Sequence, residues 1–316
     1  MGRILPVKKL KGDTNMKNGT LWKDMEGNDI QAHGGMILRY EGVYFWYVEH
    51  KGADNCPGTT RVDVIGVSCY SSTDLMNWKY EGLVIEADRE NPESPMYYQK
   101  VCERPKVIYC KKTGKFVLWM HLDSADYTFA GVGIAVSDSP VGPFTLIAAK
   151  QPNRLDARDM TIFQDHDGTA YLFHSSNWNK MMAISRLTED YTDVDGFFKY
   201  AMIDQSREAP AVCRHDGRYY MVTSGCTGWE PNSALYSVSD YAMVTWELID
   251  NPCEGPNYRR TFEGQSTYIF EYRGQKYLML DHWKPEDLKN SGYSILPLNI
   301  DEKGIMTVTW TDEFQV

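Results

Sequence analysis

The sequence predicts an all-β protein, a five-bladed β-propeller, and two observations lead to this prediction. A strand–turn–strand unit recurs five times along the chain, and no segment sustains the i, i+3, i+4, i+7 apolar spacing of an amphipathic helix. Five units of three or four strands, arranged radially, make such a propeller. We expect a single domain over residues 1–316, because no linker or low-complexity segment interrupts the chain.

Each unit consists of a polar residue, an apolar strand, a tight turn and a second apolar strand. A later strand in the unit ends in Ser, with an aromatic residue six or seven positions on, as at Ser72 and Trp78. The last unit is degenerate, so we expect it to close the ring together with residues 1–30, which contain Trp22. The turn glycines are Gly42, Gly114, Gly168, Gly217 and Gly274.

The composition excludes several classes of protein. The net charge is −10 and the acids are scattered, which disfavours a nucleic acid or an anionic membrane as partner. No run approaches the 18 apolar residues of a membrane span. The first residues, "MGRILPVKKLKGDTN", lack the apolar stretch of a signal peptide, so we expect a cytoplasmic protein unless a leader precedes them in the native gene. The oligomeric state stays open.

Known cofactor motifs are missing from the sequence. The 7 cysteines form no C-x-x-C pair, so neither a disulfide framework nor a zinc site is indicated. The phosphate-binding loop, the H-E-x-x-H zinc motif and the G-x-S-x-G nucleophile elbow do not occur either. We therefore expect no metal and no cofactor. Aromatic residues beside carboxylates fit a neutral ligand that stacks and hydrogen-bonds, such as a sugar.

One register position collects polar side chains. In a propeller the first strand of each blade lies along the central axis, so equivalent positions at its start form a ring around one mouth of the channel. Crowded carboxylates raise one another's pKa, which keeps a carboxylic acid available as a proton donor near neutral pH. The residues nine positions before the turn glycine, or eleven in the second unit, are His33, Glu103, Asp159, Glu208 and Gln265.

Arginines adjoin three of these acids, and loops offer further polar groups. Because neighbours on a strand point to opposite faces, we expect Arg104, Arg158 and Arg207 to brace adjacent blades. His33 is as readily a structural histidine as a substrate ligand. Three tryptophans in strand-like runs, Trp46, Trp119 and Trp283, are expected in the core. The loop candidates for substrate binding are Tyr127, Asn179, Thr227 and Trp229.

Six segments together resemble glycoside hydrolase family 43, and in particular its exo-β-1,3-galactanase branch. They are "IQAHGGMILRYEGVYFWYVEHK", "ERPKVIY", "RDMTIFQDHDGTAYLFHSS", "REAPAV", "TSGCTGWEPN" and "TFEGQST", and the resemblance extends over roughly residues 20–300. It implies a five-bladed propeller, inversion at the anomeric carbon and a pocket at the propeller axis. The substrate it implies is β-1,3-galactan, the backbone of arabinogalactan, from which terminal galactose is released.

The resemblance also implies roles for the ring residues. Glu208 matches the general acid, Asp159 the residue that tunes and orients it, and Glu103 and Gln265 the polar residues around the terminal galactose. The first-blade general base of most of the family is missing, since His33 and Gly34 stand where its Asp would be. The candidates for the general base are therefore Glu103, Gln265 and His33. We expect Gln265 to position the nucleophilic water and Glu103 to hold substrate.

Two alternatives remain at this stage. The first is another specificity within the family, such as α-L-arabinofuranosidase or β-xylosidase, against which the missing base argues. The second is a propeller that binds sugar without cleaving it, which the missing base favours. The retention of both Glu208 and Asp159 argues against this second alternative, because binding needs no general acid.

Overall fold

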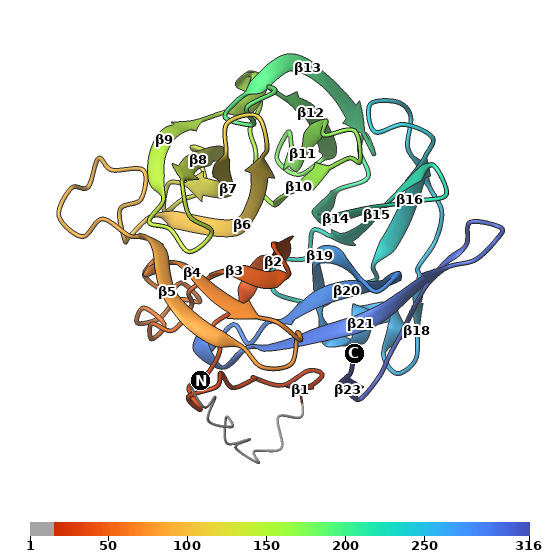
Figure 1. The fold of residues 1–316 in the computed structure, drawn as a ribbon, viewed down its shortest axis with the longest axis horizontal. Coiled ribbons are helices and arrows are strands. Elements are labelled where there is room, and N and C mark those ends of the chain that lie inside the picture. Colours follow the sequence, from red (N-terminus) through yellow and green to blue (C-terminus); the bar gives the residue numbers. More distant parts are fainter. Residues whose placement is uncertain (1–15) are drawn as a thin grey trace, which may run out of the picture.

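The computed structural model describes residues 16–316 as five antiparallel blades around a central axis (Figure 1). The first blade contains β2 (His33–Tyr40), β3 (Val43–Glu49), β4 (Gly66–Ser72) and β5 (Lys79–Glu86). The second contains β6 (Val101–Cys110), β7 (Lys115–Asp123), β8 (Gly131–Ser137) and β9 (Thr145–Lys150). The third contains β10 (Met160–Gln164), β11 (Ala170–Ser176), β12 (Met181–Leu187) and β13 (Val194–Ala201).

The fourth and fifth blades follow the same plan. The fourth contains β14 (Arg207–His215), β15 (Arg218–Gly225), β16 (Leu235–Ser239) and β17 (Glu247–Leu248). The fifth contains β19 (Gln265–Tyr272), β20 (Gln275–His282), β21 (Gly292–Ile300) and β22 (Met306–Thr309), with β18 (Cys253–Glu254) parallel to β22. Three short 3₁₀ helices are η1 (Pro152–Arg154), η2 (Tyr258–Glu263) and η3 (Leu288–Asn290). These blades confirm the predicted five-bladed propeller.

The first strand of every blade lines the axis, as the repeat predicts. Strands β2, β6, β10, β14 and β19 contact one another in sequence around the ring, and β19 returns to β2 (Figure 1). All five turn glycines follow these strands with φ between 71° and 89°, a left-handed conformation that glycine adopts without steric penalty. The starts of the five strands therefore meet at one mouth of the channel.

The two ends of the described chain join beside the fifth blade. Strand β1 (Met16–Lys17) pairs with β23 (Glu313–Phe314) as a separate two-stranded sheet, and Trp22 packs against Trp46 and Tyr293. This pairing brings the N-terminal segment and the last unit together, but as a separate sheet that belongs to no blade, so it does not complete the fifth blade as predicted. The fifth blade itself is not degenerate, because its four antiparallel strands all come from residues 265–309. Residues 1–15 of that segment lie outside the described part.

The apolar core is divided into five clusters, one between each pair of neighbouring blades. Trp46 and Trp119 are fully buried in two of them, as predicted. Each blade therefore buries both of its faces against its neighbours, which holds the mouth residues of different blades in fixed positions.

A bulge follows the mouth residue in four of the five blades. The strand register shifts after His33, Glu103 and Glu208, and again after Ser266 in the last blade. Arg104 and Ala209, the residues after two of the mouth acids, both have φ of 53°. Bulges of this kind re-aim side chains and are common beside active sites.

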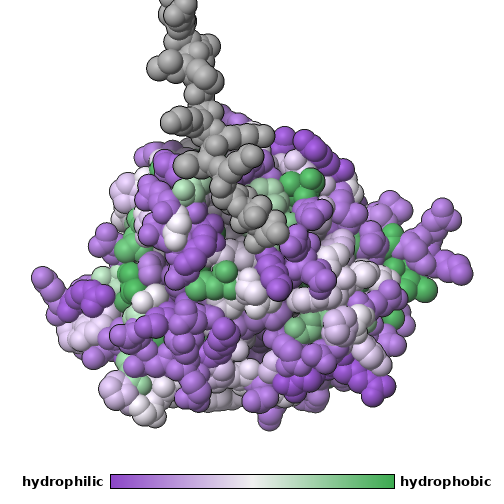
Figure 2. Space-filling view, turned by 90° about the horizontal axis from the view of Figure 1, so that it is seen from below, coloured by the Kyte–Doolittle hydropathy of each residue, from purple (hydrophilic) through white to green (hydrophobic). Residues whose placement is uncertain are grey.

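No helix within residues 16–316 is long and apolar enough to cross a membrane. The side of the molecule in Figure 2 is mainly hydrophilic, with apolar residues in small separate groups.

Candidate active site

A cavity of about 280 Å³ opens at the mouth formed by the strand starts. Its wall includes four of the five predicted ring residues, so the register argument is confirmed for their convergence. A larger hollow of about 1130 Å³ lies elsewhere, near the turn ends of the first three blades, and contains none of the ring residues. The residues lining the smaller cavity are Glu49, Glu103, Arg104, Tyr127, Asp159, Glu208, Gly228, Trp229, Gln265 and Trp283.

Arg104, on the second blade, joins three other blades at this cavity. Its Nε and Nη2 donate to the two oxygens of Asp159 at 3.0 and 2.8 Å, and Nη2 also donates to Gln265 Oε1 at 2.7 Å. Glu49 Oε1 accepts from the Arg104 backbone N–H at 2.8 Å. The bidentate ion pair orients the Asp159 carboxylate and fixes its distance from the neighbouring acids.

The expectation that the arginines brace adjacent blades holds for Arg104 and Arg158 but not for Arg207. Arg104 braces adjacent blades, but it also lines the cavity beside Glu103, because the bulge after Glu103 abolishes the alternation of faces. Arg158 donates both to Asp156 in its own blade and to the Tyr127 carbonyl of the blade before. Arg207 braces no neighbouring blade through its side chain: its hydrogen bonds, to Thr223 and Ser233, stay within the fourth blade.

Gln265 has all four of its amide hydrogen-bonding positions occupied. Its Oε1 accepts from Arg104 and, at 2.9 Å, from Trp283 Nε1, which are both groups that can only donate. Its Nε2 donates to Glu208 Oε1 at 3.2 Å and to Ser224 Oγ at 3.0 Å. The contacts therefore fix the orientation of the amide, and neither lone pair of Oε1 is free.

Glu208 is held in an environment that favours its protonated form. Burial is the main cause and the nearby Asp159 charge the second, and together they raise the pKa of Glu208 to about 8 against the opposing effect of Arg104. Asn179 Nδ2 donates to its Oε2 at 3.2 Å. A carboxylic acid that keeps its proton at neutral pH can serve as a general acid.

Glu103 is held in the opposite state. Burial disfavours its charge, but Lys51 at 3.6 Å and His121 at 3.2 Å outweigh burial and hold the pKa of Glu103 well below its usual range. The Tyr127 hydroxyl donates to Glu103 Oε1 at 3.1 Å. An ionised carboxylate lining the cavity can bind sugar hydroxyls or accept a proton from water.

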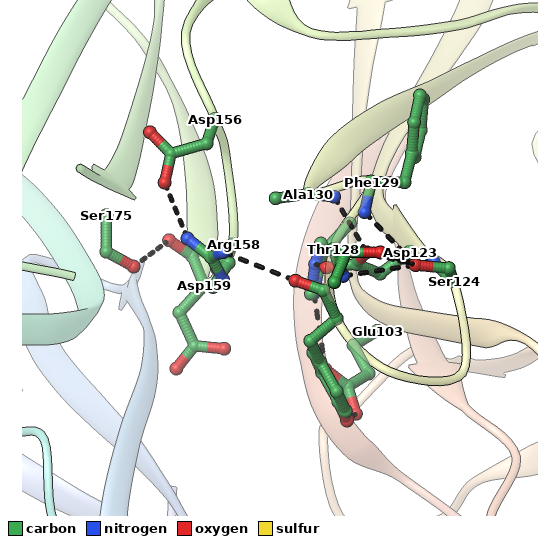
Figure 3. A network of polar contacts seen from close by, with 12 residues as sticks. Glu103, Asp123, Ser124, Thr128, Phe129, Ala130, Asp156, Arg158, Asp159 and Ser175 are labelled. Carbon is green, nitrogen blue, oxygen red and sulfur yellow. Dashed lines mark hydrogen bonds and ion pairs between the residues drawn. The ribbon is translucent and has the colours of Figure 1, made fainter. Parts of the chain in front are cut away.

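The buried carboxylate of Asp123, which Figure 3 shows beside Ser124 and Ala130, supports two of the partners of Glu103. Asp123 Oδ2 contacts His121 Nε2 at 3.1 Å. Burial lowers the pKa of His121, but Asp123 and Glu103 outweigh burial and raise this pKa to about 9. Asp123 Oδ1 accepts from the backbone N–H groups of Ser124 and Ala130 at 2.8 and 2.7 Å, which closes the loop that carries Tyr127. Asp123 thus fixes both the imidazolium and the phenol that contact Glu103.

The structure places His33 away from the cavity. Its side chain is fully buried, contacts the Tyr293 hydroxyl at 3.1 Å and stacks on Trp283 with ring centroids 5.2 Å apart. The predicted role of His33 as a substrate ligand is therefore corrected to that of a packing residue behind the wall. Trp283, expected in the core, is itself part of that wall and reaches Gln265.

The four loop candidates for substrate binding also differ in their positions relative to the cavity. Tyr127 and Trp229 line the cavity, and Trp229 packs edge-on against Trp283 with centroids 5.3 Å apart. Asn179 reaches the site through Glu208. Thr227 is exposed beside the cavity rather than in its wall, and its hydroxyl accepts from Asn232 Nδ2 at 2.7 Å. Its predicted contact with substrate has no support from its position.

Several functional residues escaped the sequence analysis because they lie on the second strand of each blade. Glu49, His121, Ser224 and Asp281 are the cross-strand partners of His33, Glu103, Glu208 and Gln265 respectively. The signal that could have revealed them is the same register, counted forward from the turn glycine instead of backward. Within residues 16–316, no group of three or more His, Cys, Asp or Glu side chains is arranged to hold a metal ion.

The fold and the carboxylates at its mouth define a glycoside hydrolase. The family model for glycosyl hydrolases family 43 matches residues 29–253, and the chain belongs to that family. It is also similar to a solved family 43 β-1,3-galactosidase with galactodeoxynojirimycin, at 36% identity over 95% of this chain and 100% of that one, with a TM-score of 0.90.

Other known proteins match this chain with varying coverage. An exo-β-1,3-galactanase from Phanerochaete chrysosporium, with β-1,3-galactotriose, is 31% identical over 96% of this chain and 69% of that one, with a TM-score of 0.87. An arabinoxylan arabinofuranohydrolase from Paenibacillus polymyxa is 24% identical over 68% of this chain. The chain spans 39% of the length of this curated relative.

Proposed function

We propose that this protein is an exo-acting, inverting hydrolase that releases terminal galactose from β-1,3-galactan. The observation that carries the proposal is the pair Glu208 and Asp159, in which a protonated acid faces a cavity beside a fixed carboxylate. A volume of about 280 Å³ lies just below the range of ligand pockets, which suits one terminal sugar rather than an internal stretch of chain.

The proposed reaction has one displacement. Water attacks the anomeric carbon from the face opposite the leaving group, the glycosidic C–O bond breaks, and the leaving oxygen takes the proton of Glu208. The water gives its proton to a base. The relatives that support the substrate assignment are the β-1,3-galactosidase and the exo-β-1,3-galactanase described above.

The identity of the base is part of the proposal. We assign the nucleophilic water to Gln265 and the sugar hydroxyls to Glu103, as expected from the sequence. In this assignment Gln265 Oε1 takes the proton of the water while Nε2 releases one, so that the amide passes through its imidic-acid tautomer. Because Arg104 and Trp283 occupy both lone pairs of Gln265 Oε1, this role requires one of those contacts to open when substrate binds. Glu103, ionised and lining the cavity, is the alternative base.

The test is an analysis of products with three polysaccharides: β-1,3-galactan, an arabinan and an arabinoxylan. The arabinoxylan is included because curated relatives are named for arabinose release from it. We expect galactose alone, first as the α-anomer in NMR spectra taken during the reaction. Arabinose or xylose as the main product, or no sugar from any substrate, would overturn the proposal.

A further inference from the structure

An exposed tryptophan stands beside the general acid. Trp178 has 67% of its surface exposed, and it lies in the loop between β11 and β12. Its neighbour Asn179 donates to Glu208 Oε2 at 3.2 Å. The indole is not among the residues that line the cavity, so it lies outside the place of the terminal sugar but on the side of the acid.

The backbone of this loop is held in a conformation that these residues rarely adopt. Asn177, Trp178 and Asn179 have φ of 51°, 54° and 60°, three consecutive left-handed residues without a glycine. The carboxylate of Asp156 accepts from the N–H groups of Asn177 and Trp178 at 2.6 and 2.9 Å. Strain of this kind persists only where the surroundings fix it, and it concentrates at functional sites.

One face of the indole is already covered. The Arg158 guanidinium carbon lies 4.5 Å from the ring centroid, and Arg158 is itself fixed by Asp156 at 2.6 Å. A contact between an arginine and an exposed ring is not by itself a sign of function. Arg186 and Phe197 on β13 form one at the same distance of 4.5 Å, and Phe197 is 64% exposed. What distinguishes Trp178 is the strained loop and the contact of its neighbour with Glu208.

We propose that Trp178 is a stacking platform for a galactose unit on the leaving-group side of the cleaved bond. This inference rests on the proposed function. A general acid lies next to the oxygen that it protonates, so the rest of the galactan chain must leave the cavity past Glu208 and Asn179. The C–H face of a galactose ring is apolar and matches the free face of an indole. Because the loop is fixed beforehand, little freedom is lost when the sugar binds.

The test separates the leaving-side sugar from the terminal one. Trp178→Ala and Trp178→Asn are assayed on β-1,3-galactotriose and on β-galactosyl fluoride, which has no leaving-side sugar. Asn tolerates the left-handed backbone, so it removes the ring while preserving the loop. We expect kcat/KM on the trisaccharide to fall by about tenfold in both variants, and kcat/KM on the fluoride to stay within about twofold. Trp178→Phe should recover most of the loss.

Phe197→Ala is the matched control, since it removes an equally exposed ring from an equal arginine contact in the same blade. It should leave both substrates unchanged. Equal losses on the two substrates in Trp178→Asn, or an unchanged trisaccharide rate, would overturn the platform. If the unmodified enzyme releases no galactose from the trisaccharide, the proposed function itself fails, and the platform falls with it.

Discussion

The starts of the second and fourth blades carry the same residue type in opposite protonation states. Glu103 and Glu208 occupy equivalent positions, each on the first strand and each followed by a bulge. Burial disfavours the charge on both. At Glu103, Lys51 and His121 reverse that effect and depress the pKa, whereas at Glu208 the Asp159 charge reinforces it and raises the pKa to about 8.

The difference comes from the second strand and from the neighbouring blade. The cross-strand partner of Glu103 is His121, which contacts it, whereas the partner of Glu208 is Ser224, which carries no charge. Arg104, which could have neutralised Glu208, is instead committed to Asp159 through two hydrogen bonds. Two carboxylates on one scaffold thus acquire different chemistry through their surroundings alone.

The largest expected effect follows from removing the proton donor. Glu208→Gln keeps the shape of the side chain but cannot protonate a leaving oxygen, so kcat on β-1,3-galactan should fall at least about 100-fold. Activity on an aryl galactoside with a good leaving group should fall much less, because that group needs little protonation. Steady-state kinetics on both substrates provide the measurement, and equal losses would contradict the acid assignment.

The second prediction compares the two candidates for the base. Gln265→Gly should lose about 100-fold in kcat, because it removes the proposed water ligand and frees Arg104 and Trp283. Glu103→Gln should mainly raise KM. Added azide, a small anion that can replace a lost base, distinguishes the roles. If Gln265→Gly retains near-normal kcat while Glu103→Gly is inactive and azide restores it, the assignment is reversed.

Much of this architecture could be predicted from the sequence, and the reason is the repeat. The turn glycines fix where each first strand ends, so counting back from them locates Glu103, Asp159, Glu208 and Gln265 at one mouth. Those distances are set within a single hairpin. His33 satisfies the same count but is buried behind Trp283. The count could not predict this position, because it follows one strand and contains no information on how the first and fifth blades pack.

What could not be predicted depends on contacts between blades and on the bulges. Alternation along a regular strand places Glu103 and Arg104 on opposite faces, but the bulge brings both to the cavity wall. The pairing of Arg104 depends on Asp159, which lies 55 residues later in the sequence, at the start of the next blade. The pKa difference between the two glutamates therefore emerges only in the assembled ring.

The third prediction concerns pH and sharpens the contrast between the two acids. Glu208 acts as general acid only when protonated. Its contribution to catalysis is therefore complete at low pH and is lost as the pH rises through its pKa of about 8. We expect the basic limb of kcat/KM near that pH. In Asp159→Asn the repelling charge is absent and Arg104 is released, so the limb of the residual activity should move to lower pH. A limb that stays near pH 8 would exclude Asp159 as the tuning residue.

The smallest effect is expected from Asp123, the buried carboxylate that supports the surroundings of Glu103. In Asp123→Asn the side-chain oxygen can still accept from the loop N–H groups, so the Tyr127 loop should hold. The amide nitrogen, however, would donate to His121 Nε2, which favours a neutral imidazole. We expect KM to rise by about threefold with kcat nearly unchanged, since one charge-assisted contact of Glu103 is weakened.

Asp165→Asn is the matched control for this last prediction. Asp165 is also a buried carboxylate that accepts from a backbone N–H, at His166, and from Arg214, but it lies beside the larger hollow far from the mouth. Both variants should lose stability, whereas only Asp123→Asn should change KM.

NMR of the His121 ring gives a readout that stability does not affect. In the unmodified protein its proton should persist to about pH 9, and in Asp123→Asn it should be lost at lower pH. A His121 titration unchanged by the substitution would show that Glu103, without Asp123, holds the proton on His121.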